Sequence, residues 1–304
     1  YDKPSCTLRF GTNLGMNDVC FAETFQPEFG CAVQLDNDAN CAALGEATAG
    51  AGKNVKNMLM ITLGTGVGGG IIIDGKLYTG CNSLAGELGH IVIRQGGEPC
   101  GCGRRGCLEA YSSAAALVKF AHRALDAGRE SSLRENGPDL NAKHICDAVD
   151  AGDALACELF ETYCDDLACG LSSFINIFQP ECIVLDEPTA MLDPQGRADI
   201  MRILHELHEK QHITIILITH HMDEAVQAQR VAVLDGGHLV MDGTPREIFT
   251  QTKRLRALGL EAPQSIELLE RINQTAGEQI PMDALTVTEC ADRLEAWLKG
   301  GAQK

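Results

Sequence analysis

Residues 86–109, GELGHIVIRQGGEPCGCGRRGCLE, carry the most specific pattern in this 304-residue chain. Cys100, Cys102 and Cys107 fall within eight residues, and His90 lies ten positions before the first of them. Three thiolates and one imidazole suit tetrahedral Zn²⁺, and four protein ligands make a closed, structural site. The intervening glycines let the chain turn tightly enough for the sulfur atoms to converge. The pattern predicts a zinc loop over residues 90–107; unligated, reduced thiols in a surface loop are the alternative.

Two further motifs precede this loop. CAVQLDNDANCAALGEATAG (31–50) predicts a short strand, a polar turn and then a helix of small residues. LGTGVGGG (63–70) lies between apolar runs and predicts two strands joined by a glycine-rich turn, with Asp74 and Gly75 closing a second hairpin. Each motif has a simpler interpretation, because Asn37 and Asp38 are typical helix caps and LGTGVGGG alone is an ordinary glycine hairpin.

Four motifs, DNDANCAALGE, LGTGVGGG, GELGH and CGCGRRGCLE, together resemble the ROK family of bacterial sugar kinases and repressors. They occur in the family's order over about residues 31–185 and look most like the glucokinase branch. The resemblance implies a partial actin-like (ribonuclease H-like) α/β fold with a zinc loop. It also implies ATP- and Mg²⁺-dependent phosphorylation of a hexose such as glucose at the 6-hydroxyl, and a possible homodimer through this region.

The resemblance also implies roles for individual residues. Asp38 matches the base that takes the proton from the sugar 6-hydroxyl. The residues that match ligands of the sugar ring are Asn37, Glu87, His90 and Glu109. The residues that match a phosphate-binding turn, whose backbone N–H groups face ATP, are Gly64, Thr65 and Gly66. His90 thus matches a zinc ligand and a sugar ligand at once.

The pattern changes after Pro180. CIVLDEP (182–188) predicts a buried strand, residues 195–210 an amphipathic helix, and ITIILITH (213–220) another buried strand. A strand, helix and strand at this spacing predict a βαβ unit in a parallel sheet. VAVLDGGHLVMDG (231–243) predicts a hairpin, and the last fifty residues are charged and helical in pattern.

IVLDEPTAMLDP (183–194) and ILITHHMDEA (216–225) resemble the Walker B, D-loop and switch regions of ABC transporter ATPases. Residues 231–249 and the helical tail resemble the energy-coupling-factor branch. The resemblance implies Mg²⁺ coordination by Asp186, activation of water by Glu187, a D-loop role for Asp193 and a γ-phosphate contact for His220. No G-x-x-x-x-G-K-[ST] loop occurs in the chain, so we expect little ATP hydrolysis that depends on Glu187.

The chain therefore divides by resemblance into a ROK sugar kinase fragment (1–182) and an ABC ATPase C-terminal fragment (183–304), a partial P-loop NTPase-type segment. PECIVL (180–185) fits both families and marks the junction. Neither resemblance includes the whole nucleotide site, so we expect impaired phosphoryl transfer. Three functions remain open: a hexose kinase, a transporter ATPase subunit that binds membrane partners, and a non-catalytic chimera that keeps zinc and sugar binding.

Composition narrows the class of protein. The formal net charge of −17 argues against nucleic acid as a partner, because its phosphates attract basic patches. No segment has the length and hydrophobicity of a membrane span, and the N-terminus lacks the pattern of a signal peptide, so we expect a cytoplasmic protein. Outside the zinc loop, most of the 14 cysteines are expected to be reduced. Residues 1–30 show weak patterning and are expected to be irregular.

Overall fold

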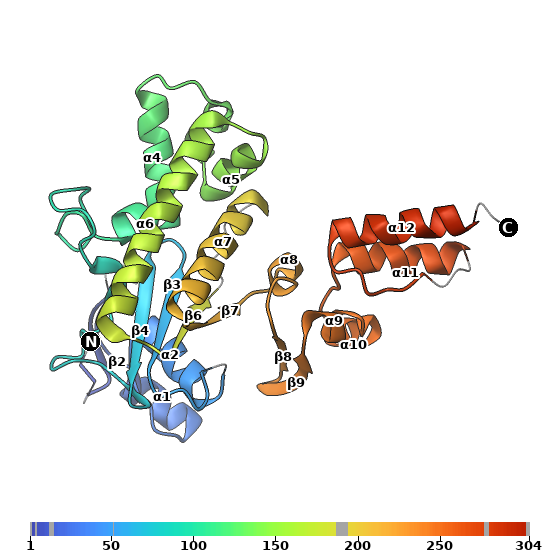
Figure 1. The fold of residues 1–304 in the computed structure, drawn as a ribbon. Helices are drawn as coiled ribbons and strands as arrows, with labels where there is room; N and C mark the ends of the chain where they lie inside the picture. The colour runs from blue at the N-terminus through green and yellow to red at the C-terminus, as the bar shows by residue number, and fades with distance from the viewer. Residues whose placement is uncertain are drawn as a thin grey trace. The chain divides into compact units, whose positions relative to one another are not determined.

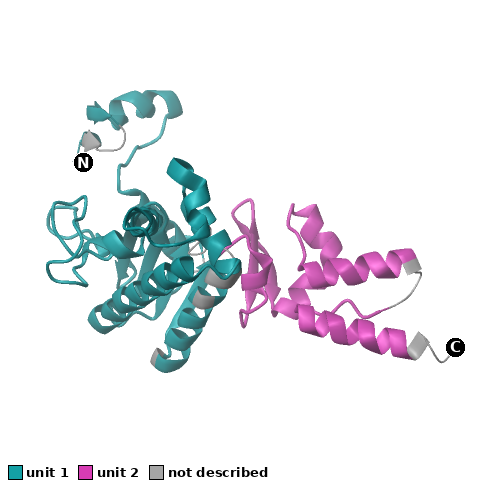
Figure 2. Ribbon diagram, turned by 90° about the horizontal axis from the view of Figure 1, so that it is seen from above, with its two compact units in different colours: residues 1–218 teal, residues 219–304 magenta. Residues whose placement is uncertain are grey.

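The computed structural model describes residues 2–3, 5–11, 15–50, 52–186, 194–276 and 280–301. The chain forms two compact units, residues 1–218 and 219–304 (Figure 2). This division does not coincide with the predicted change of sequence family at residues 182–183, because the strand, helix and strand that follow residue 182 belong to unit 1. The predicted boundary separates two sequence families and not two folded units, and it stays a prediction.

A five-stranded mixed sheet forms the centre of unit 1, in the order β5-β4-β3-β6-β7 (Figure 1). Its strands are β3 (Met58–Leu63), β4 (Val67–Ile73), β5 (Lys76–Leu77), β6 (Cys182–Asp186) and β7 (Thr214–Ile218). β3, β4 and β5 form an antiparallel meander, whereas β3, β6 and β7 are parallel. The predicted glycine-turn hairpin, the second hairpin and the parallel βαβ unit are confirmed.

Both faces of this sheet are buried, because its central strands are apolar at nearly every position. Side chains alternate between the faces along each strand. Met58, Met60 and Val184 form one core with Ala43 of α2 (Asp38–Thr48). The intervening residues form the larger core with α6 (Ala154–Phe178) and α7 (Pro194–Gln211); they are Leu59, Ile61, Ile183 and Leu185.

Five further helices of unit 1 lie between β5 and α6. They are η1 (Leu88–His90), α3 (Glu109–Ser112), α4 (Ala114–Asp126), η2 (Ser132–Asp139) and α5 (Ala142–Asp150). Asp153 caps the start of the long helix α6, and its side chain accepts hydrogen bonds from Leu155 N (3.0 Å) and Ala156 N (3.1 Å). This cap satisfies two backbone donors that have no partner within the helix.

The N-terminal segment differs from its prediction as irregular chain. It forms an antiparallel hairpin of β1 (Thr7–Gly11) and β2 (Met16–Cys20), followed by α1 (Phe21–Phe29). Pairing between the two strands forms this hairpin, although apolar and polar residues alternate only weakly along the segment. The expected strand within residues 31–35 is also wrong, because this stretch has no regular secondary structure.

Unit 2 contains one antiparallel hairpin and a set of helices. The hairpin pairs β8 (Val231–Asp235) with β9 (His238–Gly243), as predicted, and Gly236 and Gly237 adopt the positive φ of its turn. The helices are α8 (Met222–Ala225), α9 (Pro245–Phe249), α10 (Thr252–Ala257), α11 (Gln264–Ala276) and α12 (Val287–Gly301). Among the residues that the structure describes, no helix combines the length and hydrophobicity that a bilayer span requires.

Candidate functional site

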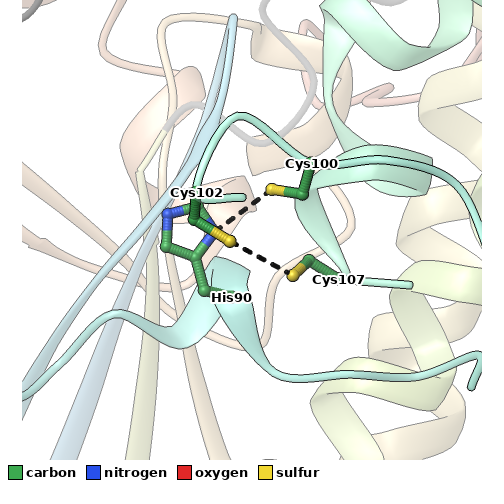
Figure 3. Close-up of side chains that lie close together, drawn as sticks. All are labelled: His90, Cys100, Cys102 and Cys107. Atoms are coloured by element: carbon green, nitrogen blue, oxygen red, sulfur yellow. Dashed lines mark hydrogen bonds between the residues drawn. The ribbon is translucent and has the colours of Figure 1, made fainter. Parts of the chain in front are cut away.

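The four predicted metal ligands lie together in one loop of unit 1 (Figure 3). Cys100 Sγ is 3.5 Å from His90 Nδ1, and Cys102 Sγ is 3.6 Å from Cys107 Sγ. All four ligand atoms lie within 4.8 Å of one another. His90 comes from η1, whereas the sulfur atoms come from a loop that ends at α3.

Two glycines explain how the chain folds back on itself here. Gly103 and Gly106 have φ values of 85° and 84°, a region that residues with a Cβ rarely adopt. A Cβ on Gly106 would lie 1.8 Å from Arg94 O, so no other residue fits at this position. Gly106 O also accepts hydrogen bonds from Ile93 N and Arg94 N, which fixes the base of the loop.

The three thiols have different acidities. A hydrogen bond from the backbone N–H of Arg104 lowers the pKa of Cys102 to about 6. Burial raises the pKa of Cys107 to about 12 and also raises the pKa of Cys100. A thiol buried without a cation resists ionisation, whereas a coordinated cation stabilises the thiolate. Cys102 is therefore the thiolate most easily formed before a metal ion binds.

The donor set fits tetrahedral Zn²⁺. Zn–S and Zn–N bonds of about 2.3 and 2.05 Å give tetrahedral S–S and S–N edges of about 3.8 and 3.6 Å. The Cys102–Cys107 and Cys100–His90 separations of 3.6 and 3.5 Å are close to these values. The widest separations, up to 4.8 Å, would have to contract by roughly 1 Å. Such an ion would be structural and would hold η1 and the start of α3 together.

The segments that carry the candidate sugar ligands come together around the start of β4, where glycines allow close approach. An added Cβ at any of three glycines would come too close to another segment. At Gly66 it would lie 2.7 Å from Glu109 Oε2, and at Gly68 it would lie 3.2 Å from Ala39 Cβ. At Gly69 it would lie 2.6 Å from the Leu88 side chain. Asp38 precedes Ala39, and Glu87 precedes Leu88. The structure thus brings the start of α2, η1 and the start of α3 to one end of one strand.

Glu109 links the loop of candidate metal ligands (residues 90–107, called the metal loop below) to the glycine turn at residues 64–66. Its Oε2 accepts a hydrogen bond from Val67 N at 3.1 Å, and its Oε1 lies 3.9 Å from His90 Nδ1. Oε1 also lies 3.8 Å from Cys100 Sγ. One carboxylate therefore contacts both the backbone of β4 and two of the candidate zinc ligands.

Asn37 and Asp38 lie at the start of α2, and Asn37 is the helix cap. Its Oδ1 accepts from Ala39 N (2.9 Å) and Asn40 N (3.2 Å), which leaves its Nδ2 to donate elsewhere. The Asp38 side chain is exposed, as a base that must meet a substrate has to be. The simpler capping interpretation of Asn37 is thus confirmed, and it leaves the amide nitrogen available for a sugar.

Asn40 was not predicted as a site residue. It is 2% exposed, its Nδ2 donates to Asp36 Oδ1 at 3.0 Å, and its Oδ1 has no hydrogen-bond partner among the described residues. A Cβ on Gly86 would lie 3.4 Å from this oxygen. A second asparagine three positions after Asn37, in a helix of otherwise small residues, is the sequence signal that points to it.

The residues predicted to bind nucleotide are distributed over both units. Gly64, Thr65 and Gly66 form the β3–β4 turn, in which Gly64 O accepts from Ala114 N at 2.9 Å and Thr65 is exposed. Asp186 ends β6 and is in register with Thr62 near the end of β3. Because parallel strands end at the same edge, Asp186 lies at the sheet edge that carries this turn.

Three predicted ATPase residues remain, namely Glu187, Asp193 and His220. Glu187 and Asp193 lie outside the described residues. His220 is exposed and belongs to unit 2, where its ring lies 4.1 Å from that of His221.

The sequence of the chain matches the model of the ROK family over residues 2–228. The chain therefore belongs to the ROK family, as the four motifs predicted. This match extends past residue 182 through β6, α7 and β7, the elements that complete the sheet.

Known proteins support both resemblances. The chain is 42% identical over 177 residues to a glucokinase of Halalkalibacterium halodurans, which covers 57% of this chain and 54% of that protein. It is 50% identical over 120 residues to an energy-coupling factor transporter ATP-binding protein of Clostridium novyi, which covers 40% of this chain and 42% of that protein. The chain thus spans about half the length of these curated relatives.

Among solved structures, a ROK family glucokinase from Streptomyces griseus in complex with glucose and AMPPNP is similar to this chain. It has a TM-score of 0.55 and 31% identity, and the match covers 70% of this chain and 72% of that one. The predicted α/β sugar kinase fold is therefore confirmed at the level of the family. The separate match to transporter ATPases over 40% of the chain is consistent with a fusion.

Proposed function

We propose that unit 1 binds a hexose such as glucose and phosphorylates its 6-hydroxyl with ATP and Mg²⁺. One observation carries this proposal: the start of α2, η1 and the start of α3 meet at the glycine-rich start of β4. The three segments carry a carboxylate base and several hydrogen-bonding side chains, and the β3–β4 turn before β4 offers backbone N–H groups suited to phosphate. Likeness to glucokinases supports the same conclusion.

Each residue has a chemical task in this proposal. Asp38 accepts the proton of the 6-hydroxyl as that oxygen attacks the γ-phosphate. Glu87 and Glu109 accept hydrogen bonds from ring hydroxyls, and the free amide of Asn37 donates one. His90 would hold a zinc ion through Nδ1, which faces Cys100, and would leave Nε2 to bind the sugar. A bound zinc ion would fix His90 and Glu109 and would take no part in the transfer itself.

Phosphoryl transfer is proposed to be weak relative to sugar binding. Neither resemblance includes the whole nucleotide site, and the chain contains no phosphate-binding loop of the G-x-x-x-x-G-K-[ST] type. Hexose binding does not require the nucleotide elements, so it is expected to persist when transfer is slow.

Glucose titrations by calorimetry and ligand-observed NMR test the proposal on the zinc-loaded full chain. Wild type is expected to bind glucose, Glu87→Gln to bind at least about tenfold more weakly, and Asp38→Asn to bind as wild type does, because proton removal is needed only during transfer. Glucose-dependent formation of ADP should vanish in Asp38→Asn. Absence of glucose binding by a folded, zinc-loaded wild type would refute the hexose site.

A role as the ATP-binding subunit of a transporter is the second candidate. The 50% identity to an energy-coupling factor ATP-binding protein favours it, and so does the position of Asp186 at the end of a parallel strand. Co-purification with the membrane subunits of such a transporter tests it. ATP hydrolysis that disappears in Glu187→Gln would favour this function over the kinase.

A further inference from the structure

A cavity of about 390 Å³ lies in unit 1, apart from the residues assigned to sugar and nucleotide. One wall is the backbone of the metal loop, with Arg94, Gly97 and Arg105; the others come from α3, α4 and α6. Pockets for small molecules measure roughly 300–1,000 Å³, so this cavity suits a ligand at the small end of that range.

The floor of the cavity is apolar and aromatic. Tyr111 and Phe120 stack with ring centroids 6.0 Å apart, and Leu117 and Leu159 also line it. The hydroxyl of Tyr111 accepts a hydrogen bond from Glu98 N at 2.7 Å, and the Arg94 guanidinium lies over the Tyr111 ring, 4.8 Å from its centroid. Such a surface suits a flat apolar group.

The charges around the cavity leave an excess of positive charge. Arg123 (2.6 Å) and Lys119 (2.8 Å) both pair with Glu98, so this carboxylate is already satisfied. Arg94 pairs with Asp166 at 2.6 Å. Arg105 has no carboxylate within 4 Å among the described residues, and its Nε reaches only Gly96 O, at 3.4 Å. The charged residues that line the cavity are thus two arginines, Arg94 and Arg105, and one carboxylate, Glu98, in a chain whose net charge is −17.

The wall that carries the arginines is held in place by backbone bonds. Gly106 N donates to Glu98 O at 2.7 Å, and Gly106 O accepts from the N–H of Arg94 at 3.2 Å. Gly97 N donates to Arg94 O at 3.0 Å. A wall of this rigidity loses little freedom when a ligand binds, which favours binding.

We propose that this cavity binds a small organic acid, in which a carboxylate or phosphate on a flat apolar body meets Arg105 while the body packs against Leu117, Phe120 and Leu159. A guanidinium group binds either anion through two parallel hydrogen bonds. The cavity is separate from the proposed hexose site, and binding to it does not depend on kinase activity.

Ligand-observed NMR and calorimetry on the zinc-loaded full chain test this site with four probes: phenyl phosphate, benzoate, inorganic phosphate and benzyl alcohol. Phenyl phosphate, benzoate or both should bind saturably, and inorganic phosphate and benzyl alcohol at least about tenfold more weakly. The stronger of the two acids identifies the preferred anion. Arg105→Gln should weaken binding about tenfold. Thr162→Trp, at an exposed position on the rim, should abolish it because the indole fills the cavity.

Arg202→Gln is the matched control, since it removes an arginine of α7 that pairs with Glu206 and does not line the cavity. It should leave the affinities unchanged. The proposal fails if neither acid binds the wild type, or if inorganic phosphate binds as well as phenyl phosphate. It also fails if Arg202→Gln weakens binding as much as Arg105→Gln, or if Thr162→Trp binds as wild type does.

Discussion

Gly70 of β4 allows α2 to lie close against the sheet, and its replacement by alanine should separate the two elements. A Cβ on Gly70 would lie 2.4 Å from Ala43 Cβ and 2.9 Å from Ala39 O. Carbon atoms in contact lie about 3.5–4.0 Å apart, so α2 would have to retreat by roughly 1 Å. The contacting atoms belong to the helix backbone and to a Cβ, which cannot rotate away.

The expected cost of Gly70→Ala follows from this retreat. Overpacking of a buried site costs about 1–3 kcal/mol of unfolding free energy. Because Asp38 lies at the start of the displaced helix, the rate of phosphoryl transfer should fall by about 100-fold, the usual effect of a misplacement of roughly 1 Å.

Gly45→Ala is the matched control, because it lies in the same helix and a Cβ there would meet nothing within 4 Å. It should stabilise the chain by up to about 1 kcal/mol through helix propensity. Urea unfolding followed by circular dichroism, with hydrogen exchange of the α2 amides, measures both variants. If Gly70→Ala unfolds at the wild-type urea concentration and protects α2 equally, the proposed close packing of α2 on β4 is incorrect.

The other predictions concern the metal and pH. Protein purified without added metal should contain about one zinc per chain, and elemental analysis of a Cys102→Ser, Cys107→Ser double variant should show its loss; full zinc content in this variant would refute the assignment of ligands. Glu98 has a folded-state pKa lowered from 4.5 to about 2 by Arg123 and Lys119, so its ion pairs stabilise the fold above the unfolded-state pKa and are lost as pH falls toward 2. Stability should therefore fall less steeply between pH 4.5 and 2 in Glu98→Gln than in wild type; equal slopes would show that these ion pairs do not contribute.

Short-range patterns in the sequence predicted the cluster of candidate metal ligands and most of the elements. His90 and the three cysteines lie within 18 residues, so their convergence needs only a few turns of the backbone, which the glycines supply. The apolar runs of β3, β6 and β7 and the helical periodicity of α7 are likewise local, and they specified a βαβ unit in the sequence from Cys182 to Ile218. The two families could be distinguished because their motifs are contiguous strings.

Tertiary structure alone decided which distant segments meet. Asn57 N donates to Glu181 Oε1 across 124 positions of sequence, and the pairing of β3 with β6 that follows joins the strand after the junction to the sheet before it. No periodicity encodes such a pairing, because it depends on matching two buried faces at once. The same reason explains the missed β1–β2 hairpin, the boundary at residues 218–219 and the cavity beneath the metal loop. Each arises where side chains from separate elements pack together, and that packing is a property of the folded chain.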